Sequence, residues 1–587
     1  MKYKNLIILF FAIIVGLIFS LENILPYLAT RNSPDKIYTV FKGGDENLYA
    51  AEIREVLEGK LFSGDAFIYE NRQKPPFTQW LAILVMGLLA KVFGSLELIH
   101  LLGNFFFPAG IFLLIFSFVD RITKHYWGAV VTALATLFLF QLTTKLPPLT
   151  PSLFHSFLNM ITLKEPVIFG FSSLVTRQFS FMVFFLFIIS FYELLNNNHK
   201  KYWPILCGLS SGLLIYIYIY YWTASAVILG IGFLLKRGKP LFWAGIYSIL
   251  ASAYFLIPYS QGGLIERQIA EGRIDGRFFE PLTTLRYGVF CVAIFLLIKN
   301  KPLKQLLLSI FLAAVILMNL QLILGYTVDP GHWPNAVFEP MAVIAVGLMV
   351  FSRFKRFTKH IWLLIIPIVF YALANQAAMA KALLSTRQLT KNENELFQWL
   401  NHYGQADSVV LTLDKRLNRY LPVLTPVYVY LPYGALTQLS LDQIWERADL
   451  AFSIYNLNQE EISKKLLETQ FIGHLFEQSY NYLNVDDLSG LDFPDEAKIR
   501  ISRAQPVFSL GVRYIPDNIK QTQAEKTLAL EKLPLKERIC RYRLDYVIVT
   551  AGDQPSPFIS SGKDIFQPVL EKGSLSLYRI NPKLCQN

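Results

Sequence analysis

Two adjacent carboxylates, Asp45 and Glu46, follow a pair of glycines in the stretch FKGGDENLYAAEIREVLEGKLF. A carboxylate that is partly shielded from water can have its pKa raised and can accept a proton from an attacking hydroxyl group. Glycines beside it let a substrate approach the backbone. One carboxylate suffices when the leaving group is already good, such as a phosphate, whereas glycoside hydrolases usually use two at a set separation. Asp45 and Glu46 are therefore candidate catalytic residues.

The same residues also suit a purely structural role. Asp45 can cap a helix that begins here, Gly43 and Gly44 can form the turn before it, and Glu46 favours the helix dipole. Helical spacing separates an apolar face from most of the polar side chains, as in a helix lying on a membrane surface. The apolar face holds Tyr49, Ile53, Val56 and Leu57, and the polar residues are Asn47, Arg54, Glu55 and Glu58.

Basic residues elsewhere in the chain are candidates for binding a phosphate, because Arg and Lys form charge-assisted hydrogen bonds with it. These candidates are Lys74 before a Pro-Pro pair, Arg177 in FSSLVTRQFS, and Arg267, Arg273 and Arg277 in SQGGLIERQIAEGRIDGRFFEPLTTLR. Lys74 and Arg177 equally suit contacts with lipid headgroups. The three loop arginines equally suit ion pairs with the acidic residues of their own loop.

His332 lies near Asp329 in the short segment GYTVDPGHWPNAVFEP. A histidine can relay a proton or bind an acceptor. A Trp-containing turn at the membrane interface is the other interpretation of this segment. Nothing in the chain has the Cys/His spacing of a metal site, so no metal or other cofactor is predicted. A requirement for a divalent metal is left open.

The composition places these residues in a membrane protein. Hydrophobic residues make up 53% of the 587 residues and charged residues only 17%. The net charge of +12 could suggest nucleic acid, but Lys and Arg occur in short clusters between apolar runs, as topology determinants do. The first segment has a basic end and an apolar run too long for a signal peptide, so it is predicted to stay as the first span.

Six basic clusters serve as tie points for the topology, because loops rich in Lys and Arg stay in the cytoplasm. They are Lys2/Lys4, Arg121/Lys124/His125, Lys200/Lys201, Lys236/Arg237/Lys239, Lys299/Lys301/Lys304 and Arg353/Lys355/Arg356/Lys359. An even number of spans must separate neighbouring clusters, but three apolar stretches lie between the first two clusters. The shortest of the three, near 77–93, is therefore assigned to an interfacial or re-entrant helix. The other runs give spans near 5–28, 98–119, 126–142, 179–195, two within 204–235, 241–258, 286–298, 303–325, 337–352 and 361–380. The N-terminus is then cytoplasmic and the tail extracytoplasmic.

From about residue 381 the pattern changes to that of a soluble α/β domain. An amphipathic helix is predicted over 391–403, further helices near 440–453 and 458–470, and strands at 408–412, 426–431, 545–550 and 575–580. No Gly-rich phosphate loop or Gly-x-Ser-x-Gly motif occurs in this part. The interpretation is a structural or acceptor-binding domain. Cys540 and Cys585 can form a disulfide in an oxidising compartment or remain free thiols.

Three features occur in order near the start of the chain: a first span, the acidic stretch GGDENLYAAEIREVLEGKLF, and NRQKPPFTQWLAILVMGLLAKVFG. Over roughly residues 1–125 this order resembles the GT-C superfamily of membrane glycosyltransferases. The nearest branch is that of the protein mannosyltransferases and aminoarabinose transferases, in which a Lys/His-Pro-Pro element follows the acidic motif. The resemblance implies an enzyme that uses a polyprenyl-phosphate sugar, with Asp45 as the general base. The chain lacks Trp-Trp-Asp-Tyr-Gly, so an oligosaccharyltransferase is not expected.

The sequence thus predicts a polytopic α-helical membrane protein of about eleven transmembrane helices, GT-C-like over 1–380 with a first extracytoplasmic loop at 29–97, and an extracytoplasmic α/β domain over 381–587. The predicted reaction moves a sugar, with inversion, from a polyprenyl-phosphate donor to an extracytoplasmic glycan, lipid or protein. The protein is placed in the cell (plasma or inner) membrane, in contact with membrane lipids and without a nucleic-acid partner. A lipid or glycan transporter and a non-catalytic membrane assembly protein are the alternatives. Charges lying mostly in loops, with only polar residues such as Asn104, Asn319 and Gln321 inside the spans, count against coupled transport.

Overall fold

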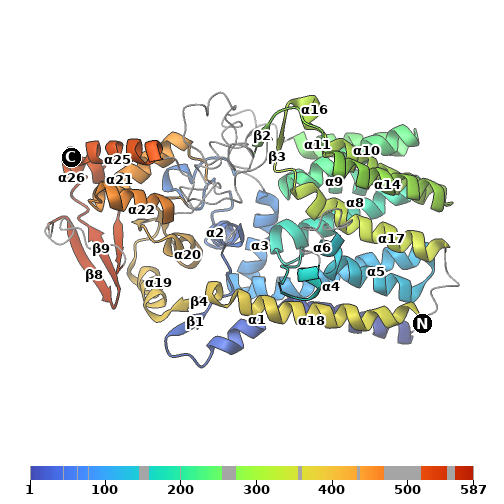
Figure 1. Cartoon of the computed structure of the whole chain (residues 1–587), viewed down its shortest axis with the longest axis horizontal. Helices are drawn as coiled ribbons and strands as arrows, with labels where there is room; N and C mark the ends of the chain where they lie inside the picture. The colour runs from blue at the N-terminus through green and yellow to red at the C-terminus, as the bar shows by residue number, and fades with distance from the viewer. Residues whose placement is uncertain are drawn as a thin grey trace.

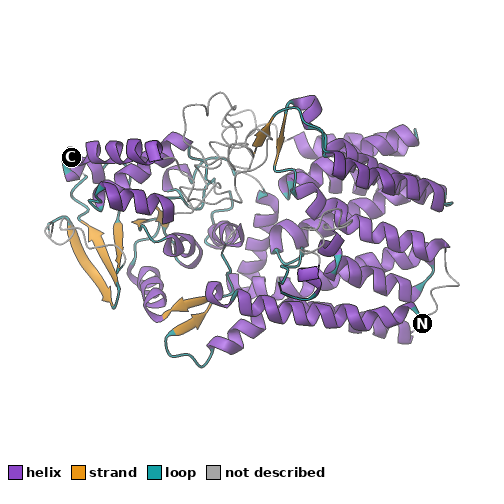
Figure 2. Ribbon diagram, in the orientation of Figure 1, coloured by secondary structure: helices purple, strands orange, loops and turns teal. Residues whose placement is uncertain are grey.

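The computed structural model describes residues 2–43, 45–62, 64–76, 79–143, 158–164, 166–197, 200–253, 273–353, 360–432, 437–468, 517–551, 562 and 564–585. Helices dominate this part of the chain, and the strands gather mainly in the C-terminal region (Figure 2). The long apolar helices lie together on one side of the molecule, and the C-terminal sheet with its helices lies on the other (Figure 1).

Each span predicted from the sequence coincides with a helix. These helices are α1 (Lys2–Thr30), α4 (Leu96–Thr123), α5 (Tyr126–Phe138), α8 (Ser180–Leu195), α9 (Tyr202–Leu213), α10 (Ile219–Leu235), α11 (Lys239–Ser252), α14 (Pro281–Leu297), α15 (Lys301–Leu317), α17 (Glu339–Arg353) and α18 (Ile365–Ala382). Among the described residues, 6 helical segments are long and apolar enough to cross a membrane. The other predicted spans fall on shorter helices, so the full number of crossings remains a prediction.

The described residues of the basic clusters meet at one end of these helices, as the even-number rule requires. The contacts that join them are Tyr126 hydroxyl to Lys4 carbonyl at 3.1 Å, Arg121 to Glu193 at 2.7 Å, Lys236 to Leu195 carbonyl at 2.6 Å, Gln305 to Leu235 carbonyl at 3.2 Å, and the stacked rings of His125 and Phe351 at 5.0 Å. Which side of the membrane this end faces remains a prediction.

The expectation that the spans hold only scattered polar residues is wrong. Glu22, Glu193 and Glu339 are buried carboxylates within helices. Each forms an ion pair with a basic residue near a helix end: Glu22 with Lys42 and Arg387, Glu193 with Arg121, and Glu339 with Arg286. Arg286, where the sequence predicts a span to begin, lies inside α14, which begins at Pro281. Pairing makes burial of these charges tolerable.

Two short helices, α2 (Asp45–Leu57) and α3 (Trp80–Phe93), lie between the first two long helices in sequence. They pack on each other, and α3 also packs on α4. The apolar residues Ile53, Val56, Ala82 and Met86 form the buried contact between them. That α3 lies along the membrane surface remains a prediction.

The C-terminal region contains a five-stranded sheet in the order β6-β5-β7-β9-β8. Its strands are β5 (Val409–Leu411), β6 (Tyr428–Val429), β7 (Tyr546–Thr550), β8 (Phe566–Lys572) and β9 (Leu575–Ile580). β5 is parallel to β6 and β7, whereas β9 is antiparallel to β7 and β8. The four strands predicted from β-branched runs are β5, β6, β7 and β9. The boundary of a separate domain at residue 381 remains a prediction.

Helices α19 (Lys391–Tyr403), α20 (Lys415–Leu424), α21 (Leu441–Ile454), α22 (Gln459–Glu468), α25 (Asp517–Glu531) and α26 (Leu535–Ile539) accompany the sheet. A capping box formed by Thr390 and Glu393 starts α19, which coincides with the predicted helix. Cys540 and Cys585 form a disulfide with a Cα–Cα distance of 5.5 Å. This disulfide ties the end of α26 to the chain after β9.

The C-terminal region packs directly against the first loop. Phe67 and Ile53 of the loop share one hydrophobic cluster with Val410 and Leu577 of the sheet. β1 (Lys36–Tyr38) of the loop pairs antiparallel with β4 (Gln388–Thr390). The first loop therefore packs against the C-terminal region, and the position of α2 depends on contacts with both the long helices and that region.

Candidate active site

The acidic stretch forms a turn and the first residues of α2. Gly43 has φ +86°, in the left-handed region that favours glycine. Its N–H donates to Asn47 Oδ1 at 2.9 Å, which holds the turn against the helix. Asp45, which was predicted to be the N-cap, is instead the first residue of the helix, and its side chain lies outside what the structure describes.

Three of the four polar residues named for α2 are buried, although the spacing suits a helix lying on a membrane surface. Asn47 and Glu55 are 0% exposed and Arg54 is 6% exposed. The reason is that α20 packs against this face of the helix. Arg54 Nε donates to Pro422 O at 2.5 Å, and Asn47 Nδ2 donates to Arg419 O at 3.4 Å.

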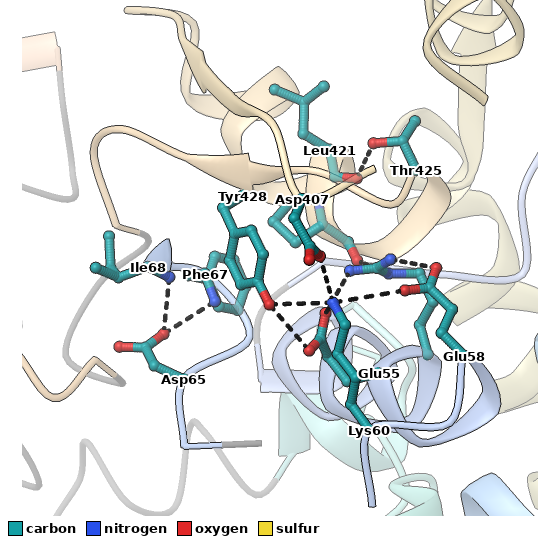
Figure 3. Close-up of polar contacts among 12 residues, drawn as sticks. Glu55, Glu58, Lys60, Asp65, Phe67, Ile68, Asp407, Leu421, Thr425 and Tyr428 are labelled. Carbon is teal, nitrogen blue, oxygen red and sulfur yellow. Dashed lines mark hydrogen bonds and ion pairs between the residues drawn. The ribbon is translucent and has the colours of Figure 1, made fainter. Parts of the chain in front are cut away.

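The far end of α2 is fixed by a network of charges shown in Figure 3. Lys60 Nζ lies 2.6 Å from Asp407 and 3.2 Å from Glu55, and the Tyr428 hydroxyl donates to Glu55 at 3.1 Å. Burial, and then the neighbouring Glu55 and Asp407 carboxylates, raise the pKa of Tyr428, which keeps its hydroxyl protonated as the donor. Glu55 is the fully buried member of this network, whereas Lys60 and Asp407 are partly exposed, so the network joins the end of α2 to the C-terminal region at its edge.

Glu46 and His100 bring two unsatisfied polar atoms to the start of α2. Glu46 Oε1 is enclosed without a hydrogen-bond partner, and so is His100 Nε2, on a side chain that is 5% exposed. The His100 ring packs edge-on against Phe41, two residues before the glycine turn, with ring centroids 5.2 Å apart. The His100 Nδ1 atom lies 2.9 Å from the Leu96 carbonyl, so Nδ1 donates and the neutral ring keeps Nε2 as an acceptor. A carboxylate and an imidazole acceptor can together take up a proton.

A buried ion cluster lies beside this pair. Lys42, just before the glycine turn, pairs with Glu22 of α1 at 3.0 Å and donates to the Ser172 carbonyl at 3.3 Å. Arg387 pairs with the same Glu22 oxygen at 2.7 Å and donates to Asn23 at 2.5 Å. The cluster therefore anchors the acidic stretch to α1 and to the chain that enters the C-terminal region.

Of the predicted phosphate-binding residues, Lys74 and Arg277 have described side chains with no contact to Glu46. Lys74 is exposed, and Arg277 donates to the Leu322 carbonyl at 2.9 Å near β2 (Arg273–Asp275). The backbone of Arg273 lies in β2, which pairs with β3 (Tyr326–Val328), but its side chain and the whole of Arg267 lie outside the described residues. No contact within the described residues joins Lys74 or Arg277 to Glu46.

His332 belongs to a second polar group, rich in tyrosine. His332 Nε2 lies 2.8 Å from Asp329, its Nδ1 bonds the Tyr218 hydroxyl, and its ring stacks on Tyr220 with centroids 4.6 Å apart. Arg177 lies in the helical turn at Leu174–Phe179, with Nη1 enclosed and without a hydrogen-bond partner. An Asp-His-Tyr chain of this kind can pass a proton, so His332 keeps its candidate role.

His100 and α20 are the parts of this site that sequence reasoning missed. An ionisable residue within an apolar run is a recognised signal of function, and ELIHLLGN carried that signal. The approach of α20 joins residues more than 350 positions apart and had no local signal. Among the described residues, no group of three or more His, Cys, Asp or Glu side chains could hold a metal ion.

The fold and the site define a multi-pass membrane protein with an acidic and imidazole-containing centre between its helices and a C-terminal sheet. No protein-family model matches the chain, and no curated protein matches it.

Two solved structures are similar to it. The arabinofuranosyltransferase AftD from Mycobacteria is 12% identical, with 97% of this chain and 41% of that chain covered and a TM-score of 0.42. ArnT from Cupriavidus metallidurans, solved with undecaprenyl phosphate bound, is 12% identical, with 93% and 95% covered and a TM-score of 0.29. The chain spans about two fifths of the AftD chain.

Proposed function

We propose that the protein is a membrane glycosyltransferase of the GT-C type that moves a sugar from a polyprenyl-phosphate donor to an extracytoplasmic glycan, lipid or protein. The observation that carries the proposal is the pair of enclosed, unpartnered atoms, Glu46 Oε1 and His100 Nε2, at the start of α2. A buried polar atom without a hydrogen-bond partner costs about 1–3 kcal/mol of stability. A bound substrate that supplies the missing partner removes this cost, so such atoms favour substrate binding.

In the proposed reaction, Asp45 accepts or orients the proton of an acceptor hydroxyl. The hydroxyl oxygen forms a bond to the anomeric carbon, and the bond from that carbon to the phosphate oxygen breaks, so that polyprenyl phosphate leaves with the electron pair. Attack opposite the leaving group inverts the anomeric configuration. Glu46, the next residue in the chain, and His100 offer a second place for the proton.

The proposed orientation puts the basic clusters in the cytoplasm, and α2, α20 and the C-terminal region outside. Two observations support it. The described basic clusters meet at one end of the helices, and the disulfide Cys540–Cys585 is typical of an oxidising compartment. Lys74, Arg177, Arg267, Arg273 and Arg277 remain proposed contacts of the donor phosphate, and His332 a proposed proton relay or acceptor contact.

The test is sugar transfer by purified protein supplied with a lipid-linked sugar pool. We expect Asp45→Asn to reduce the transfer rate at least 100-fold, as loss of a catalytic proton acceptor typically does, and Glu46→Gln to reduce it less. Asp35→Asn removes an exposed carboxylate from the same loop and serves as the matched control. Normal transfer by a folded Asp45→Asn protein would exclude the proposed role. A non-catalytic assembly protein predicts no transfer by any of the variants or by the wild type.

A further inference from the structure

Helix α20 of the C-terminal region presents two cationic side chains on one face. Asp414 caps the helix by accepting from the Leu417 N–H at 2.9 Å, so it is engaged with the backbone. Lys415 and Arg419 are four residues apart and lie one above the other on the helix surface. Both are half-buried.

Three contacts place α20 against the acidic stretch. The Tyr420 hydroxyl donates to the Phe41 carbonyl at 3.2 Å, and Asn47 donates to the Arg419 carbonyl at 3.4 Å. A Cβ atom at Gly43 would lie 3.6 Å from Arg419 Nη1. The Arg419 guanidinium therefore lies against the glycine turn, and Lys415 lies one helical turn nearer the start of α20. Figure 1 shows α20 facing α2 between the long helices and the sheet.

Lys415 differs from its neighbour Arg416. Arg416 pairs with Glu393 at 2.8 Å and donates to the Ser385 carbonyl at 3.2 Å. Lys415 has no hydrogen bond or ion pair in the part of the chain that the structure describes. Burial, and then the charge of Arg419, lower the pKa of Lys415 to about 8. An anion placed between Lys415 and Arg419 would relieve this repulsion and favour the charged lysine.

We propose that Lys415 and Arg419 bind the phosphate group of the lipid donor at the glycine turn. This inference rests on the proposed function, which requires a phosphate bonded to the anomeric carbon within reach of Asp45. Arg offers a planar fork to phosphate oxygens and Lys a compact charge. The donor site is then shared between the membrane helices and the C-terminal region, and the C-terminal region takes part in donor binding as well as in structure.

The test is binding of undecaprenyl phosphate to the full-length protein in detergent. Lys415→Gln is expected to weaken binding at least tenfold, and Lys415→Met, which keeps the aliphatic stem, to do the same. Lys415→Arg, which keeps the charge, is expected to bind within about threefold of the wild type. Lys536→Gln, at an exposed lysine of α26, is the control. Undecaprenol, which lacks the phosphate, should bind all proteins equally weakly.

Each outcome decides between the claims. Wild-type affinity in both Lys415→Gln and Lys415→Met overturns the inference and leaves the proposed function standing. If vesicles containing phosphatidylglycerol compete as well as undecaprenyl phosphate, the cations bind bilayer headgroups and the donor assignment is wrong. If the wild type does not bind undecaprenyl phosphate, both claims fail. Loss of transfer in Asp45→Asn supports the proposed function, and weakened binding in Lys415→Gln and Lys415→Met supports the inference.

Discussion

Replacing Arg387 by methionine tests how the acidic stretch is held in place. Arg387 is 1% exposed and donates to Glu22 at 2.7 Å, to Asn23 at 2.5 Å and to the Val40 carbonyl at 2.7 Å. Methionine fills similar space but removes all three bonds, so Glu22 keeps only Lys42 as its ionic partner among the described residues. Removing one partner of a buried ion pair costs about 3–5 kcal/mol. Because Lys42 still compensates Glu22, we expect about 3 kcal/mol, at the lower end of that range.

The assay is hydrogen exchange of the ribbon formed by β1 and β4. The Thr39 N–H donates to the Arg387 carbonyl at 2.9 Å, and Ile37 pairs with Leu389 in the ribbon. If these amides exchange through local opening, about 3 kcal/mol corresponds to exchange roughly 100-fold faster or more, since 1.4 kcal/mol is a factor of ten. Sugar transfer should fall as well, because Lys42 and the glycine turn lose their anchor.

Arg541→Met is the control, because Arg541 is 65% exposed and its pair with Glu446 lies at the surface. Exposed pairs contribute about 0–1 kcal/mol, so the ribbon should exchange as in the wild type. Unchanged exchange of the ribbon in Arg387→Met would refute the account of this cluster as the anchor.

Three further changes give distinct outcomes. Gly43→Ala forces a side chain into the backbone conformation at φ +86°, which costs about 1–2 kcal/mol. Gly59, at the other end of α2, has a similar φ of +97°, so Gly59→Ala is the control, and Gly43→Ala should lower sugar transfer more. Cys540→Ser opens the link to Cys585, 45 residues away, and should destabilise the C-terminal region by about 3–4 kcal/mol in thermal unfolding. Binding of undecaprenyl phosphate should weaken as the pH rises above about 8, because Lys415 then loses its proton. The bound phosphate raises the pKa of Lys415, so the affinity keeps falling until the pH exceeds the pKa of Lys415 in the complex. Lys415→Arg should abolish this pH dependence.

The helices were predictable because their signals are local. Each span predicted from an apolar run coincides with a helix. The basic clusters between the runs predicted that one end of these helices carries the positive charge. The β-branched runs likewise located β5, β6, β7 and β9. β8 (Phe566–Lys572) was missed because FQPVLEK contains a proline and one β-branched residue, so its pairing with β9 and not its own composition makes it a strand.

The candidate site was only partly predictable. The acidic stretch at Asp45 was recognised from its residue types, and His100 had a signal that was not used. The burial of Asn47 and Arg54 had none, since the amphipathic pattern of α2 equally fits a helix on a membrane surface. Only the long-range packing of α20 distinguishes the two arrangements, and that packing depends on the fold of the whole C-terminal region.

The most direct test of the central claim is the lipid content of a strain that lacks this gene. We expect a polyprenyl-phosphate sugar to accumulate, because its consumer is missing, and wild-type protein supplied from a plasmid to clear it. Asp45→Asn, present in the membrane at the same level, should leave the lipid in place. Clearance by Asp45→Asn as fast as by the wild type, or no accumulation of any polyprenyl-phosphate sugar in the deletion strain, would contradict the account.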